Sequence, residues 1–76
     1  MKKTVTIDSE FIKLGQFLKY VDAVASGAEA KAVILNGEVS VNGKSEKQRG
    51  KKLRDGDQVK IGNDVFLITG DKKVDS

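Results

Sequence analysis

The spacing of apolar residues changes along this chain, and these changes constrain its fold more than any single residue does. Residues 3–7, "KTVTI", alternate and are rich in β-branched side chains, which predicts a short strand suited to a sheet edge. Further along, the spacing becomes i, i+3, i+4, i+7 and i+10, at Leu14, Phe17, Leu18, Val21 and Val24. This spacing places the side chains on one face of an α-helix and predicts a helix over residues 13–25.

A second helix is predicted directly after the first. Ser26 and Glu29 have the spacing of a capping box, in which each side chain bonds the other residue's backbone N–H. Asn36-Gly37 supplies residues that tolerate the left-handed conformation at a helix end. The second helix therefore has about ten residues. Because only Ala25 and Ser26 separate the two helices, they must turn sharply against each other.

The second half of the chain predicts strands joined by turns. The segments "EVSV", "QVKI" and "VFLIT" read as strands, and Asn42-Gly43 marks a tight turn after the first of them. We expect an α+β fold, with two packed helices against a small, mostly antiparallel sheet and an extra N-terminal strand. Residues 1–70 are expected to form one domain and residues 71–76 a flexible C-terminal tail. The predicted core residues are Val5, Ile7, Leu14, Phe17, Leu18, Val21, Val24, Ala30, Val33, Ile34, Val39, Val41, Leu53, Val59, Ile61, Phe66 and Ile68.

The composition argues against an enzyme. The chain has no Cys and no His, so thiol and imidazole chemistry is excluded, as is a metal site built on these side chains. Asp55 and Asp57 form a close pair of carboxylates, but "DGD" before a strand is typical of a turn. We expect no catalytic residues, no cofactor and no metal. No apolar run is long enough for a membrane span, and none follows Met1 as a signal peptide would, so a cytoplasmic protein is expected.

Positive charge is concentrated in the middle of the sequence. The formal net charge is only +3, but residues 44–54, here called the basic loop, carry a single anion, Glu46. The cations of this loop are Lys44, Lys47, Arg49, Lys51, Lys52 and Arg54. Such a cluster suggests a polyanionic partner. Composition alone supports a solvated surface loop equally well.

The ordered motifs "LGQFLK", "SGAEAKAVILNGEVSVNGK" and "LRDGD" resemble a known family. They are similar to the RNA-binding domain named for ribosomal small-subunit protein four, here the S-four domain, also called the αL motif. The resemblance runs from residue 13 to about residue 61, and the chain looks like small stand-alone bacterial proteins built of this domain and an N-terminal strand. It implies binding to ribosomal or transfer RNA, near translation or ribosome assembly.

The resemblance carries over to individual positions. Lys13 stands at the family's first basic position, and Ser26 matches the Ser that opens the second helix. Lys31 matches the basic residue of the family's "EAR" motif. Asn42 and Gly43 match "NG". Two positions depart from the pattern: Gly15 stands where Asp is frequent, and Gly27 replaces an Arg beside Ser26. The second change removes one expected phosphate contact and shifts binding toward the basic loop.

The residues themselves favour a similar interface. Ser26 and Gly27 open a helix whose first N–H groups suit a phosphate, and Lys31 lies one turn farther along on a similar side. Without the motif, Lys31 is an ordinary exposed lysine. Aromatic residues are few, so recognition of the RNA backbone and shape is expected more than base stacking. The predicted RNA-binding residues are Lys13, Ser26, Gly27, Lys31, Asn42, Lys44, Lys47, Arg49, Lys51, Lys52 and Arg54.

The sequence therefore predicts a non-catalytic module that docks two helices and the basic loop on structured RNA. Ribosomal or transfer RNA, and through it ribosomal particles, are the expected partners. A monomer without membrane contact is expected. Two alternatives of another class stay open: an adaptor that binds an acidic protein, and a DNA-associated factor. The basic loop is able to bind either of these negatively charged partners.

Overall fold

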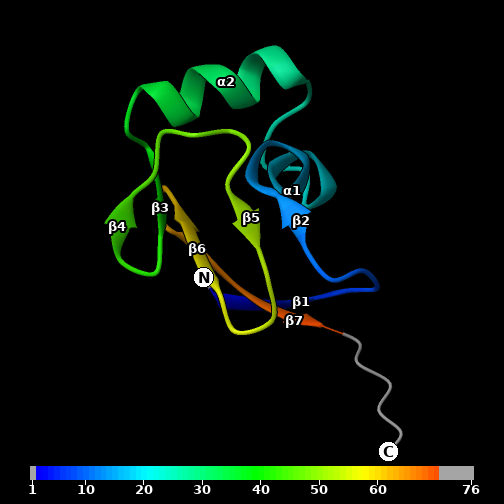
Figure 1. The fold of residues 1–76 in the computed structure, drawn as a ribbon. Coiled ribbons are helices and arrows are strands. Elements are labelled where there is room, and N and C mark those ends of the chain that lie inside the picture. The colour runs from blue at the N-terminus through cyan, green and yellow to red at the C-terminus, as the bar shows by residue number, and fades with distance from the viewer. Residues whose placement is uncertain (1, 71–76) are drawn as a thin grey trace, which may run out of the picture.

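The computed structural model describes residues 2–70 and contains two helices and a mostly antiparallel sheet (Figure 1). The tail predicted at 71–76 lies outside the described residues. The strands are β1 (Lys2–Ile7), β2 (Ile12–Lys13), β3 (Val39–Val41), β4 (Lys44–Ser45), β5 (Lys52–Leu53), β6 (Gln58–Ile61) and β7 (Asp64–Gly70). The helices are α1 (Leu14–Tyr20) and α2 (Gly27–Leu35). The expected α+β class is confirmed.

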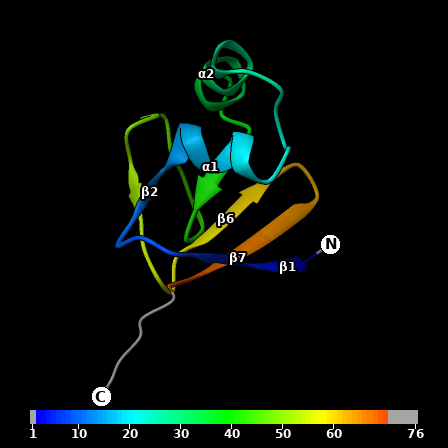
Figure 2. The ribbon, with the colours of Figure 1, turned by 90° about the vertical axis from the view of Figure 1, so that its right-hand side faces the viewer.

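Five strands form one sheet in the order β1-β7-β6-β3-β4, and β2 and β5 form a separate two-stranded ribbon. β1 runs parallel to β7 and occupies an edge, as its sequence predicts, whereas the other pairings are antiparallel. Both helices lie on one side of the sheet, with α1 nearer to it than α2 (Figures 1 and 2). The ribbon stands beside α1 and places the end of the basic loop next to it.

The first helix is shorter than predicted, since α1 ends at Tyr20 instead of residue 25. Asp22 adopts a φ of 60°, and its N–H donates to the carbonyl oxygen of Lys19 at 3.0 Å. The N–H of Ala23 donates to the carbonyl oxygen of Leu18 at 2.9 Å. These two bonds form a Schellman motif, which ends the helix. Val24 is still buried after the turn, which explains why the helical spacing continued past the helix.

The second helix begins and ends where the sequence predicts. Ser26 Oγ accepts a hydrogen bond from the N–H of Glu29 at 3.2 Å. The Glu29 carboxylate bonds the N–H of Ala25 at 2.8 Å, one residue before the partner that a capping box predicts. Gly37, with a φ of 78°, follows the helix in a second Schellman motif. Residues 21–26 separate the helices, a longer connection than expected, because α1 stops early.

Three short strands, β2, β4 and β5, were not predicted. Asn42 and Gly43 have φ values of 53° and 87°, which form the expected tight turn and bring β4 back along β3. The basic loop therefore begins and ends in paired strands, and the predicted order of elements lacked both of them. Each has only two residues, too few to show an alternating pattern.

The core agrees with the prediction. Every one of the buried hydrophobic residues belongs to the predicted set, and the remaining members, Val5, Val21, Val33 and Ile61, are partly buried against the same cluster. Phe17 of α1 and Phe66 of β7 meet edge to face, with ring centroids 5.7 Å apart. This contact joins the helical layer to the sheet. Neither helix in the described part of the chain is long and apolar enough to cross a bilayer.

Candidate nucleic-acid interface

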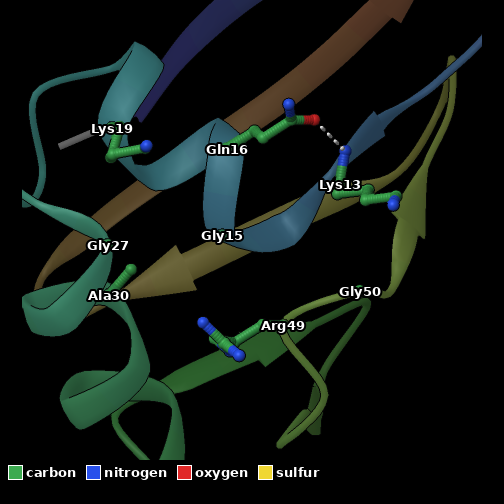
Figure 3. Close-up of a pocket in the computed structure, with 8 residues that line it drawn as sticks. All are labelled: Lys13, Gly15, Gln16, Lys19, Gly27, Ala30, Arg49 and Gly50. Atoms are coloured by element: carbon green, nitrogen blue, oxygen red, sulfur yellow. Dashed lines mark hydrogen bonds between the residues drawn. The ribbon is translucent and has the colours of Figure 1, made fainter.

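An open groove of about 490 Å³ lies between the two helices and the basic loop (Figure 3). It is lined by Lys13, Gly15, Gln16, Lys19, Gly27, Ala30, Arg49 and Gly50. In Figure 3 the Arg49 side chain reaches from the loop toward α2. Lys13 precedes the first turn of α1, and Lys19 lies in its last turn. The groove thus combines residues of α1, of α2 and of the basic loop.

The basic loop is held against α1 by backbone hydrogen bonds. The N–H of Leu14 donates to the carbonyl oxygen of Lys51 at 2.8 Å, and the N–H of Gly15 donates to the carbonyl oxygen of Arg49 at 3.0 Å. The first N–H groups of a helix have no partner within the helix, so these carbonyls satisfy two of them. The Arg49 backbone is therefore fixed beside the first turn of α1.

The electrostatic character of the groove is one-sided. Lys13, Lys19 and Arg49 line it, and among residues 2–70 no carboxylate does. All three cations are exposed. Cations gathered in a concave site attract phosphate, and the planar guanidinium of Arg49 is able to hold two phosphate oxygens at once.

Lys19 and Gln16 are groove residues that sequence reasoning missed. Both are exposed on α1, opposite its buried residues Leu14, Phe17 and Leu18. Lys13, Gln16 and Lys19 recur every three residues, which is the spacing of neighbours on one helix face. That spacing was the available sign of a shared surface. Gln16 Oε1 also accepts a hydrogen bond from the Lys13 N–H at 3.4 Å (Figure 3).

At the start of α2, Gly27 faces the groove and Ser26 does not line it. Ser26 Oγ and the Glu29 carboxylate are occupied by the cap hydrogen bonds described above. A Cβ added at Gly27 would meet nothing within 4 Å, so the space in front of it is open. Lys31 is exposed on α2 but is not part of the groove lining. Of the predicted residues of α2, the structure therefore brings only Gly27 to the groove.

Asn42 is held by hydrogen bonds within the fold. Its side-chain amide donates to the Asp57 carboxylate at 3.0 Å, and its side-chain oxygen accepts from the N–H of Gln58 at 2.9 Å. The structure thus joins the turn after β3 to β6 and does not place Asn42 in the groove. Lys44 and Lys47 are exposed, and they also lie outside the groove lining.

The remaining predicted cations belong to the end of the basic loop. Lys51 is exposed, and its carbonyl oxygen bonds α1. Lys52 lies directly opposite Lys13 in the β2–β5 ribbon. Lys52 Nζ and the guanidinium carbon of Arg54 lie 4.9 Å and 5.7 Å from the ring centroid of Phe11. The structure therefore gathers Lys13, Lys52 and Arg54 around the ribbon, next to the groove.

The carboxylates of Asp55 and Asp57 stabilise turns, as the sequence predicts. Asp55 Oδ1 accepts from the N–H of Gly70 at 2.8 Å, and Asp57 Oδ2 accepts from the N–H of Arg54 at 2.8 Å. Gly56 between them has a φ of 94°, which a glycine adopts readily. Both carboxylates thus bond backbone N–H groups that hold the turn.

Comparison with known proteins identifies the family of this chain. A family model described as "S4 domain" matches residues 5–69. A protein of Bacillus subtilis (strain 168) named "Probable ribosome maturation protein RlbA" is 46% identical to this chain over 61 residues, which cover 80% of this chain and 86% of that protein. The family model spans both helices, the basic loop and strands β2 to β6. The resemblance of the sequence to the S-four domain is confirmed, and this chain belongs to the S4 domain family.

Proposed function

We propose that this chain is a non-catalytic RNA-binding module that acts in ribosome maturation. The observation that carries the proposal is the groove, in which Lys13, Lys19 and Arg49 converge without a lining carboxylate. Membership of the S4 domain family supports RNA as the ligand. The name of the similar Bacillus subtilis protein supports a role in the maturation of ribosomes.

The groove binds the RNA backbone. Phosphates of a folded RNA lie at the spacing set by its helical geometry, and a fixed concave array of cations reads that shape more than the base sequence. The backbone bonds between α1 and the basic loop hold Arg49 in place before the RNA arrives. Such preorganisation lowers the conformational entropy lost on binding.

Outside the groove, the exposed cations of the basic loop extend the contact with phosphates. Lys44, Lys47 and Lys51 add charge on one side of the groove, and Lys31 adds charge on α2. Ser26 and Asn42 contribute by fixing the start of α2 and the turn after β3. The proposed partner is structured ribosomal RNA within a maturing particle in the cytoplasm, and transfer RNA is the second candidate. The chain binds it as a single-domain monomer.

The proposal is tested by titrating the purified protein with three nucleic acids of equal charge at several salt concentrations. These are a structured ribosomal RNA fragment, a duplex DNA and an unstructured RNA. The expected result is tightest binding to the structured RNA, with an affinity that falls as salt rises and a slope reporting about four to six phosphate contacts. Preference for the duplex DNA would favour a DNA-associated factor. Equal, weak binding to all three would contradict the proposal and direct the search toward an acidic protein partner.

A further inference from the structure

The β2–β5 ribbon has two different faces. Ile12 pairs with Leu53, and these side chains face the core, where Leu53 is fully buried and Ile12 packs against the core cluster. Side chains alternate across a strand, so Lys13 and Lys52 lie on the outer face. The next positions on that face are Phe11 and Arg54, since they continue the two strands by one residue. We call Phe11, Lys13, Lys52 and Arg54 the ribbon face.

Two cations lie close to one aromatic ring on this face. Phe11 is half-buried, and the ring lies under Lys52 Nζ at 4.9 Å and the Arg54 guanidinium carbon at 5.7 Å from its centroid. Like charges directly opposite each other in a ribbon repel, and Lys13 and Lys52 stand in that relation. A bound anion relieves this repulsion. The Phe11 backbone is itself held, because its carbonyl oxygen accepts from Ser9 Oγ at 2.8 Å.

The acidic residues nearest to Arg54 in the sequence accept hydrogen bonds within turns. Asp55 bonds the N–H of Gly70, and Asp57 bonds both the N–H of Arg54 and the side chain of Asn42. These bonds fix both carboxylates at the turns. The ribbon face therefore offers an aromatic surface and three cations to a ligand that has both a flat ring and negative charge.

We propose that the ribbon face binds an unpaired nucleotide of the RNA, an inference that rests on the proposed function. The base stacks on the Phe11 ring, and Lys52, which sits on a flexible four-carbon chain, moves from the ring to the flanking phosphate. Arg54, whose guanidinium also lies over the ring, moves with Lys52 to contact the same backbone. Only a base outside a helix is able to stack on a side chain, so the ligand is a structured RNA with a bulge or loop beside its helix.

Continuity with the groove supports this ligand. Lys13 lines the groove and also stands opposite Lys52 on the ribbon face. One RNA strand that follows the cations therefore passes from the groove, which holds phosphates, to Phe11, which holds a base. The groove by itself offers no aromatic side chain, so base stacking distinguishes the two surfaces.

The test uses two RNA hairpins that differ only in one bulged nucleotide, with the fluorescent base 2-aminopurine at the bulge. We expect the wild-type protein to bind the bulged hairpin roughly tenfold more tightly than the fully paired one and to quench the 2-aminopurine. Phe11→Leu keeps an apolar side chain on the ribbon face but removes the aromatic ring. It should lose the preference and the quenching while binding the paired hairpin as the wild type does. Phe11→Tyr, which keeps the ring, should retain both.

The outcomes separate this inference from the proposed function. Equal binding of both hairpins by the wild type, with no effect of Phe11→Leu, overturns the inference and leaves the proposed function standing. Equal weakening of both hairpins by Phe11→Leu means that Phe11 serves folding, which also overturns it; thermal melting of the variant checks this case. No binding of either hairpin by the wild type contradicts the proposed function itself.

Discussion

The N–H of Gly15, in the first turn of α1, donates a 3.0 Å hydrogen bond to the carbonyl oxygen of Arg49 in the basic loop. Leu14 makes the equivalent bond to Lys51 at 2.8 Å. The loop thus completes the start of the helix, and the helix fixes the loop. Both bonds use backbone atoms only, so the cationic side chains are free to contact a ligand without weakening this attachment.

Gly15 is a position where stability is expected to rise on substitution. A Cβ there would lie 3.6 Å from Arg49 Cβ and 3.7 Å from its carbonyl oxygen, both ordinary van der Waals contacts. Ala is favoured over Gly within a helix by about 0.5–1 kcal/mol. Gly15→Ala should therefore raise the free energy of unfolding by about that amount in urea denaturation. Destabilisation would show that the loop needs the glycine to reach the helix.

Lys19 should contribute to RNA binding although sequence reasoning missed it. Lys19→Gln removes one groove cation, and Lys60→Gln removes one exposed cation from β6, outside the groove lining. Each phosphate contact contributes about one unit to the slope of log affinity against log salt. We expect Lys19→Gln to weaken binding and to reduce this slope by about one, measured by fluorescence anisotropy. Equal effects of the two variants would mean that only net charge matters.

Gly27 offers a way to strengthen binding. The open space before it accommodates a side chain, and the position lines the groove. Gly27→Arg should add one phosphate contact, raise the affinity for structured RNA and increase the salt slope by about one. Gly27→Ala is the matched control, because it changes the backbone preference without adding charge. If Arg and Ala at this position bind RNA alike, phosphates do not approach the start of α2.

Asn42 is expected to matter for stability. It combines a φ of 53° with two side-chain hydrogen bonds, to Asp57 and Gln58. Asn42→Ala loses both bonds and puts at a left-handed position a residue that tolerates it less well than Asn, so we expect a loss of about 2–3 kcal/mol. Asn42→Gly loses the same bonds without that strain and should be roughly 1 kcal/mol less damaging. Chemical denaturation of both variants measures the difference. Equal losses would assign the whole effect to the hydrogen bonds.

The elements that the sequence predicted correctly are those set by local rules. Ser26 caps α2, and Asn42-Gly43 forms a hairpin turn, because these residue types satisfy or tolerate a specific backbone geometry. The end of α1 was wrong for a related reason. Asp22 takes the left-handed conformation that glycine usually marks, and buried Val24 continued the helical spacing beyond the last turn.

The unpredicted strands and groove residues depend on tertiary contacts. β5 exists because Leu53 pairs with Ile12, and a two-residue strand has no periodicity of its own. Lys19 lies on an exposed helix face, and no local pattern says which exposed face will meet a distant loop. That loop is positioned by backbone hydrogen bonds to Leu14 and Gly15. Every residue type except proline has the same backbone N–H and C=O groups, so the sequence does not indicate where such bonds form.

The central claim is that the groove binds structured RNA. It is tested most directly by comparing two triple variants of equal net charge with the wild type, using a structured ribosomal RNA fragment. The groove variant is Lys13→Gln, Lys19→Gln and Arg49→Gln, and the control is Lys2→Gln, Lys3→Gln and Lys60→Gln, three exposed cations of β1 and β6. We predict that the groove variant reduces the salt slope by about three, while the control stays close to the wild type. Equal losses in both variants would contradict the claim.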